Sequence, residues 1–346
     1  MPCTLAAYVR RAALALSLCA TLGAATPAAA EELKKLRMSL AFTLDASSAT
    51  YVYAKYAGLF AKAGFDVSLE ASRGSGDSIS RVASGAYDVG IADISPLIQF
   101  AAANPDKAPR AVYVVQDLAQ YAVMGSKKAG IEKPLDLAGK SVGGGTGEAA
   151  FVIFPLFAQK IGLDLSKVDL KRADVRLRET MFVHGDFQAV VGFDATLWIN
   201  AKAQGMTRDQ ITMINYGDYG LQLYGASVLV SHDFIARDPE GLRRFVAAIN
   251  TAWIATLKDP PRIAAMLPSA DPLLKVDLET ERLQAIIQGH VDTPGSRKTG
   301  LATVDRQRMQ AQIDTVAAAF ELPRKPAVDE IYTDKFLPPA AQRVVP

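Results

Sequence analysis

The stretch FDVSLEASRGSGDSISRVASGAYDVGIAD, residues 65–93, contains two strand-like segments separated by a helical one. Residues 65–71 and 87–93 each predict a strand. Between them, Ser75 is expected to cap a helix that places Ile79, Val82 and Ala83 on one face and ends at Gly85. The spacing therefore predicts a strand–helix–strand unit, from which parallel sheets are built.

The same alternation continues on both sides of this stretch. Ser95-Pro96 begins a further helix, and Asp238 with Pro239 begins a long amphipathic one. Thr146 is expected to cap the helix that follows the strand at 140–145. Other predicted strands cover 36–44, 111–116, 140–145, 168–174, 188–194, 211–216 and 224–231, with helices at 50–57, 148–161, 176–184 and 194–204. The pattern predicts an α/β fold with mainly parallel sheets covered on both faces.

The first 30 residues have the pattern of a signal peptide. Arg10 and Arg11 precede an apolar run, and Ala28-Ala29-Ala30 is a small-residue cleavage site. The run is too short to span a bilayer. Leu18 before Cys19 does not suit lipid attachment, and the arginine pair leaves the Sec and twin-arginine routes both open. We expect a periplasmic protein cleaved between Ala30 and Glu31.

Composition excludes several classes of function. Both cysteines, Cys3 and Cys19, lie in this leader, so the remainder offers no disulfide, thiolate ligand or cysteine nucleophile. The leader also holds two of the 38 basic residues, which leaves 36 against 36 acidic ones and disfavours a nucleic-acid partner. The three histidines lack metal-ligand spacing. We expect no metal and no cofactor.

Five stretches together resemble one large family. They are AKYAGLFAKAGFDVSLE (54–70), SGAYDVGIAD (84–93), DLAGKSVGGGTG (136–147), VSHDFIARDPEGLRRFVAAINTAW (230–253) and VDEIYTDKFL (328–337). In this order they resemble the periplasmic substrate-binding proteins of ABC importers, in the family of the nitrate, taurine, aliphatic-sulfonate and thiamine-pyrimidine-precursor binders. The resemblance covers nearly all of the chain after the leader.

This resemblance implies the type II periplasmic-binding-protein fold. Lobe one would hold residues 36–119 and 222–346, lobe two would hold 120–221, and two crossing strands would join them. A monomer would capture a small polar organic ligand, such as a sulfonate, an amine or a pyrimidine, between lobes that close by hinge bending. It would deliver this ligand to the permease and ATPase of the same system.

The glycine-rich stretch GGGTGEAA, residues 143–150, follows a predicted strand but is not a nucleotide loop. It lacks the Lys-Ser/Thr of a P-loop and the third glycine of a dinucleotide fingerprint. Its alternative interpretation is an ordinary tight turn. Free N–H groups at this helix start, and at RGSGDS (73–78), would suit an anionic or polar ligand group in the cleft.

Residues that follow the strand ends are the candidates for ligand binding, because ligands of open α/β sheets lie beyond the carboxyl ends of the strands. The candidates are Asp45, Ser47, Tyr51, Ser75, Gly76, Asp77, Asp93, Ser95, Gln116, Gly145, Thr146, Gly147, Glu148, Phe193, Asp194 and Tyr219. Each aspartate could instead be a helix cap. Because so many carboxylates would repel a pure oxyanion, a hydrogen-bond-donating ligand fits better.

Two other functions fit the sequence less well. An enzyme on the same fold, such as a pyrimidine-precursor synthase, would need cysteines that the chain lacks after its leader. A ligand-sensing receptor subunit would need a fused transmembrane or kinase segment. We therefore expect a binding protein and no enzyme.

The mature protein is predicted to begin near Glu31 without lipid. Mass spectrometry of the exported protein should give the mass of residues 31–346. A lipid-modified N-terminus at Cys19 would contradict the assignment.

Overall fold

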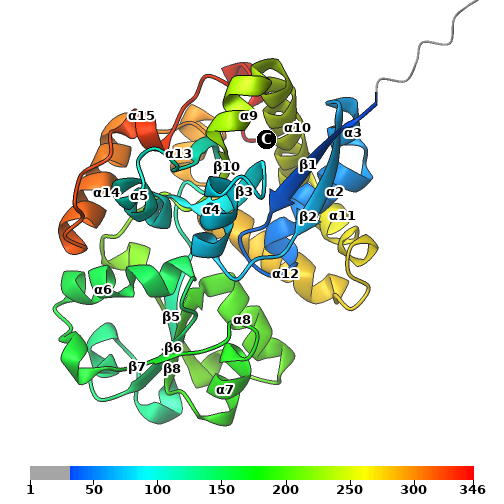
Figure 1. Cartoon of the computed structure of the whole chain (residues 1–346). Helices are drawn as coiled ribbons and strands as arrows, with labels where there is room; N and C mark the ends of the chain where they lie inside the picture. The colour runs from blue at the N-terminus through cyan, green and yellow to red at the C-terminus, as the bar shows by residue number, and fades with distance from the viewer. Residues whose placement is uncertain (1–31) are drawn as a thin grey trace, which may run out of the picture. The chain divides into compact units, whose positions relative to one another are not determined.

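A computed structural model describes residues 32–346, of which Lys34–Pro346 form one compact unit (Figure 1). The signal peptide predicted for residues 1–30 lies outside the described residues. Two five-stranded sheets organise this unit. We call the part built on the first sheet lobe one and the part built on the second lobe two.

The sheet of lobe one has the strand order β2-β1-β3-β10-β4. Its strands are β1 Lys34–Ser39, β2 Phe65–Glu70, β3 Val89–Asp93, β4 Arg110–Val114 and β10 Ala226–Val230. β1 pairs in parallel with β2 and β3, whereas β10 is antiparallel to both of its neighbours. Only the strand that returns from lobe two therefore runs against the other four.

The sheet of lobe two has the strand order β7-β6-β8-β5-β9 and the same design. Its strands are β5 Tyr121–Ser126, β6 Ser141–Gly144, β7 Asp169–Arg172, β8 Ala189–Phe193 and β9 Ile211–Asn215. β5, the first strand after the crossing, is antiparallel to β8 and β9. The sequence pattern did not predict β5. The prediction of mainly parallel α/β sheets is confirmed.

Helices cover both sheets, and most follow the strand that precedes them. They are α2 Ala49–Tyr56, α3 Leu59–Lys62, α4 Ser75–Ala83, α5 Ile94–Ala103, α6 Ala149–Ile161, α7 Arg178–His184, α8 Asp194–Ala203, α9 His232–Arg237, α10 Pro239–Lys258, α11 Pro260–Ala264, α12 Val276–Ile286, α13 Pro294–Thr299, α14 Arg306–Ala319 and α15 Val328–Ile331. One cluster of buried apolar side chains contains Ile98 of α5 and Phe154 of α6, so apolar packing joins the lobes.

Two predicted helix caps are wrong. Gly74, with φ +130°, precedes α4, while the Ser75 hydroxyl donates to the Asp93 carboxylate 2.9 Å away. Likewise Glu148, not Thr146, precedes α6. Ser75 does not cap α4 because its hydroxyl is engaged by Asp93, which lies at the end of the strand β3. The predicted Asp238 cap of α10 is confirmed, since its carboxylate accepts from Gly241 N at 2.9 Å.

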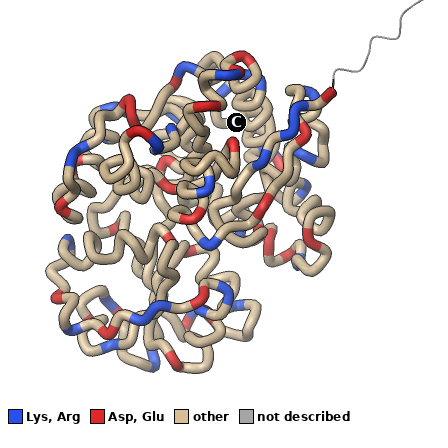
Figure 2. The backbone as a smooth tube through the Cα atoms, viewed as in Figure 1, with Lys and Arg blue, Asp and Glu red and all other residues tan. Residues whose placement is uncertain are grey.

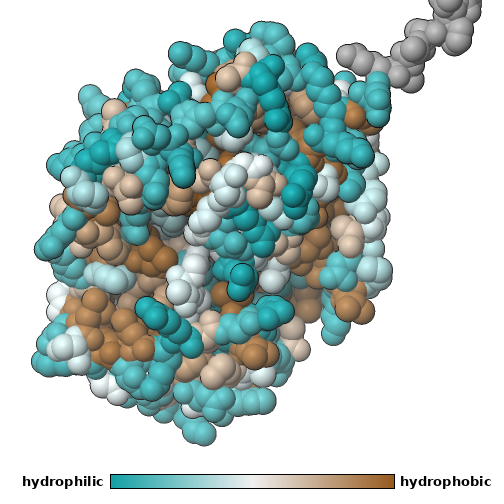
Figure 3. Space-filling model, viewed as in Figure 1, coloured by the Kyte–Doolittle hydropathy of each residue, from teal (hydrophilic) through white to brown (hydrophobic). Residues whose placement is uncertain are grey.

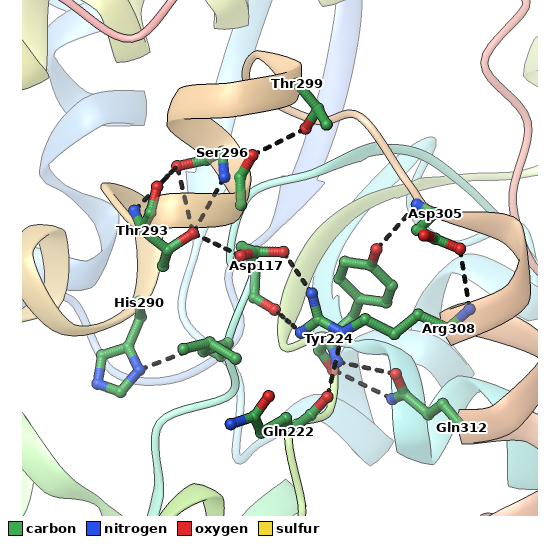
Figure 4. A network of polar contacts seen from close by, with 12 residues as sticks. Asp117, Gln222, Tyr224, His290, Thr293, Ser296, Thr299, Asp305, Arg308 and Gln312 are labelled. Carbon is green, nitrogen blue, oxygen red and sulfur yellow. Dashed lines mark hydrogen bonds and ion pairs between the residues drawn. The ribbon is translucent and has the colours of Figure 1, made fainter.

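The chain crosses between the lobes in residues 115–120 and 216–225, and C-terminal elements hold both crossings (Figure 4). Asp117 of the first crossing accepts hydrogen bonds from Thr293 and from Arg308, the latter at 2.6 Å. Arg308 also donates to Gln222 O, and its guanidinium lies 4.0 Å from the ring centre of Tyr224 in the second crossing. Both crossings are thereby anchored to α14.

Charges of both signs are interspersed along the described chain (Figure 2). On the face shown in Figure 3, hydrophobic areas lie among hydrophilic ones along the border between the lobes. Within residues 32–346, no helix is both long enough and apolar enough to cross a membrane.

Asp238→Ala should lower the free energy of unfolding by about 1 kcal/mol, because α10 loses its N-terminal cap. Lys34→Ala is the matched control, since it removes the exposed Lys34–Asp238 ion pair of 2.7 Å and leaves the cap intact. Urea unfolding measures both variants. Equal losses would show that the ion pair, and not the cap, stabilises this helix.

Candidate functional site

A small cavity, here called the inner cavity, lies where the carboxyl ends of several strands meet. Its volume is about 30 Å³. Lobe one and the crossings supply most of its wall, and Phe193 of lobe two closes it. The lining residues include Leu40, Ala41, Ser47, Ser48, Tyr51, Ile91, Asp93, Val115, Gln116, Gln120, Phe193, Ala226, Trp253 and Ile286. This is the position at which open α/β sheets bind their ligands.

Asp93 is the most unusual group of the inner cavity. It ends β3, and its carboxylate is 1% exposed. Oδ2 accepts from Ser75 Oγ at 2.9 Å, whereas Oδ1 has no hydrogen-bond partner among residues 32–346. Burial raises the pKa of Asp93 to about 6; the Ser75 hydroxyl and the nearby Tyr121 oppose this rise, and the negative charge of Glu148 adds to it.

Gln120 adds a second acceptor to this wall. It ends the first crossing, is 3% exposed, and its Oε1 has no partner within the described part of the chain. Gln116, by contrast, uses its Oε1 to accept from Ala226 N at 3.1 Å. Two orphaned acceptors in one small cavity require an explanation, because a buried acceptor without a donor costs about 1–3 kcal/mol.

Aromatic side chains form part of the wall of the inner cavity. Tyr51 and Trp253 meet edge to face with ring centres 6.5 Å apart. The Phe193 ring stacks against Tyr121 with ring centres 6.3 Å apart. Among these apolar surfaces, Asp93 and Gln120 contribute buried polar atoms that no other described residue engages.

Two other predicted carboxylates are held by arginines that are distant in sequence. Arg178, fully buried, donates to both Glu148 and Glu179. Arg282 donates to Asp45 at 2.8 Å and lies 3.2 Å from Glu279. Asp45 also accepts from the Ser47 hydroxyl at 2.6 Å. Asp45 and Glu148 therefore have structural partners that Asp93 lacks.

A second and larger space, the outer cavity, lies between loops of the two lobes and has a volume of about 630 Å³. Its lining includes Asp77 and the predicted turn residues Gly145, Thr146 and Gly147. Asp77 pairs with Arg81 at 2.9 Å, and Asp174 pairs with Arg176 at 2.6 Å. Arg73 forms no ion pair within residues 32–346.

Glycines let the two lobes touch through their backbones beside the outer cavity. Gly76 N of lobe one donates to Gly147 O of lobe two at 3.2 Å. A Cβ on Gly74 would lie only 2.4 Å from Gly147 O, and the φ of +130° at Gly74 also requires glycine. The N–H of Gly76, expected to be free for a ligand, is thus used between the lobes.

The remaining predicted residues lie apart from the inner cavity. The buried Ser95 accepts from Gln312 at 2.9 Å. Asp194 pairs with His290 at 2.9 Å. Tyr219 is 40% exposed and packs edge to face on Phe157. Of the sixteen predicted residues, the structure brings Ser47, Tyr51, Asp93, Gln116 and Phe193 into the wall of the inner cavity, while Ser75 fixes Asp93 from behind.

Gln120 and Trp253 line the inner cavity but are not among the sixteen predicted residues, and Trp253 also belongs to the apolar core. Gln120 immediately precedes β5, so recognising that strand would have pointed to it. Trp253 lies at a helical position within α10, where its spacing does not distinguish a core side chain from one that lines a cavity. Within residues 32–346, no group of three or more His, Cys, Asp and Glu residues is arranged to hold a metal.

The sequence of residues 45–263, more than half of the chain, matches the family described as NMT1/THI5 like. The chain belongs to this family, and the resemblance drawn from its sequence is confirmed. A search of curated proteins finds no match.

Solved structures of binding proteins share this fold. The alkanesulfonate-binding protein SsuA of Xanthomonas axonopodis pv. citri, bound to MOPS, aligns with TM-score 0.69 at 17% identity over 87% of this chain and 99% of that one. SsuA of Escherichia coli aligns with TM-score 0.64 at 18% identity over 90% of this chain and 92% of that one. The nitrate-binding protein NrtA of Synechocystis PCC 6803 aligns with TM-score 0.62 at 11% identity over 90% of this chain and 89% of that one. At these identities the likeness establishes the fold alone.

Asp93→Asn should stabilise the protein more at pH 8 than at pH 4.5. The pKa of Asp93 in the folded state is about 6, whereas its ordinary value is 3.8. The wild type therefore loses stability as the pH rises from 3.8 to 6, because the buried carboxyl must then carry a charge, and this loss is absent below pH 3.8. The difference in unfolding free energy between variant and wild type should therefore increase by about 1–3 kcal/mol between the two pH values.

Urea unfolding at both pH values, without added ligand, measures this difference. Asp66→Asn, on the exposed face of β2, is the control and should show no comparable increase. A difference for Asp93→Asn that does not change with pH would contradict the assignment of a raised pKa.

Proposed function

We propose that this protein is the solute-binding component of an ABC import system and that its ligand is a small polar organic compound. The observation that carries the proposal is the inner cavity, which lies at the carboxyl ends of strands from both sheets and is lined by unpartnered polar groups. The fold shared with SsuA and NrtA supports a binding protein, and the lack of cysteine after the leader disfavours an enzyme such as a pyrimidine-precursor synthase.

The proposed mechanism is capture by closure of two lobes, residues 36–119 with 222–346 and residues 120–221. A volume of about 30 Å³ admits a water-sized group, so a larger ligand requires the lobes to part. The crossings, held to α14 through Arg308, would be the hinges. The Gly76–Gly147 hydrogen bond and the 2.8 Å bond from Arg282 to Asn200 would re-form on closure.

The cellular setting follows from the same proposal. A protein with the predicted signal peptide would act in the periplasm. SsuA of Escherichia coli and NrtA are both named as periplasmic binding proteins. We propose that this protein acts there as a monomer. The closed form would then dock on a permease that an ATPase drives.

A compound that binds between the lobes should raise the melting temperature and make the protein more compact. At a hundred-fold excess over the dissociation constant, linkage stabilises the folded state by about 2.7 kcal/mol. A thermal-shift screen of amines, sulfonates, nitrate, pyrimidines and aromatic acids should find such a compound, and small-angle scattering should give a smaller radius of gyration with it.

Two results would count against the proposal. One is a screen in which no compound changes the melting temperature. The other is a stabilising compound that leaves the scattering profile unchanged, because binding would then not involve closure of the lobes.

A further inference from the structure

Two buried acceptors in the wall of the inner cavity have no hydrogen-bond partner within the described part of the chain. Asp93 Oδ1 and Gln120 Oε1 belong to side chains that are at least 97% buried, since these are 1% and 3% exposed. Both atoms lack a partner among residues 32–346, and both side chains line the cavity. Buried acceptors in this state are expected to receive hydrogen bonds from whatever occupies the cavity.

Buried carboxylates also outnumber the arginines that pair with them in this part of the protein. The buried acidic residues of the described chain are Asp45, Asp93, Glu148, Glu179 and Glu279. Arg282 offsets Asp45 and Glu279, and Arg178 offsets Glu148 and Glu179, so each arginine faces two carboxylates. Asp93 alone among them forms no ion pair, since the nearby His290 is paired with Asp194. A buried charge is stable only when it is paired, so a cationic group would complete this site.

The helix N-termini that could attract an anion already carry carboxylates of the protein. Asp93 immediately precedes the ten-residue helix α5, and Glu148 immediately precedes α6. Asp194 begins α8. An oxyanion approaching these helices would meet negative charges at the positions where a helix otherwise favours it.

We infer that the ligand group which enters the inner cavity is a hydrogen-bond donor, namely an ammonium, an amidinium or the N–H of an amino-heterocycle, and not an oxyanion. This inference rests on the proposed function. Asp93 and Gln120 accept from the donor, and the aromatic side chains of Tyr51, Trp253 and Phe193 line the same cavity, where an aromatic ring favours a cation.

Two buried donors also lack a hydrogen-bond partner among residues 32–346: the Tyr121 hydroxyl, which lies close to Asp93, and Trp253 Nε1, which belongs to a lining side chain beside Tyr51. Each is neutral and can satisfy one acceptor at most, so neither offsets the charge of Asp93. The volume of about 30 Å³ matches a single ammonium-sized group. The remainder of a larger ligand would occupy space created when the lobes part.

The test compares matched probes that differ only in the charged group. Benzamidine is paired with benzenesulfonate, and propylamine with propanesulfonate. Thermal shift and calorimetric titration at pH 8 are run on the full protein, on Asp93→Asn and Gln120→Met, and on the exposed control Asp66→Asn. The melting temperature of each variant without a probe shows whether it is folded.

We expect at least one nitrogen probe to bind and its sulfonate partner not to bind. Loss of a charge-assisted hydrogen bond should weaken binding by about ten- to a hundred-fold in Asp93→Asn, and loss of a neutral one by about two- to ten-fold in Gln120→Met. Asp66→Asn should bind like the wild type.

Binding of the sulfonates alone would overturn the inference and leave the proposed function intact. If the substitution Arg73→Ala then abolished sulfonate binding, the anion site would lie in the outer cavity, which Arg73 lines. Nitrogen probes that bind Asp93→Asn and the wild type equally would also overturn it. Binding of no probe of either kind would contradict the proposed function itself, and the inference with it.

Discussion

The carboxylate of Asp93 is the group on which the candidate site depends. It is buried where β3 ends and α5 begins, and Ser75 of α4 donates to only one of its oxygens. Its other oxygen and its charge are uncompensated within the described chain. A folded protein retains such a group at a cost in stability, and functional sites are where that cost is commonly found.

The second constraint is steric and lies between the lobes. Because Gly74 has no side chain, the loop after β6 can approach the start of α4 closely enough for Gly76 N to donate to Gly147 O. On another side of the cleft, Arg282 of α12 reaches Asn200 of α8. Arg282 also holds Asp45, whose own hydrogen bond positions Ser47 in the wall of the inner cavity. In the proposed mechanism, closure of the lobes and the shape of the inner cavity would therefore be coupled.

Local sequence patterns predicted most of the fold, since periodicity and turn residues identify strands and helices one by one. The local pattern does not predict β5, which directly follows the first crossing. The caps at Ser75 and Thr146 were assigned wrongly. At Ser75, a partner 18 residues away takes the hydroxyl.

The site was harder to predict than the fold for a similar reason. Strand ends placed five of the sixteen predicted residues in the wall of the inner cavity, yet they do not reveal which carboxylates have partners. Glu148 meets Arg178 across 30 residues, and Asp45 meets Arg282 across 237. Only the assembled structure shows that Asp93 lacks such a partner, and this distinction, more than proximity to the cleft, is the reason we propose Asp93 as the carboxylate that contacts the ligand.

Infrared difference spectroscopy near pH 6 tests this account most directly, because a carboxylic acid and a carboxylate absorb at different frequencies. With a pKa of about 6, and with Glu148, His290, Tyr121 and Ser75 around it, Asp93 is partly protonated at that pH. Saturation with an amine or amidine that the protein binds should remove an acid carbonyl band in the wild type and cause no such change in Asp93→Asn. An unchanged acid band on binding, or the same loss in Asp93→Asn, would contradict the account.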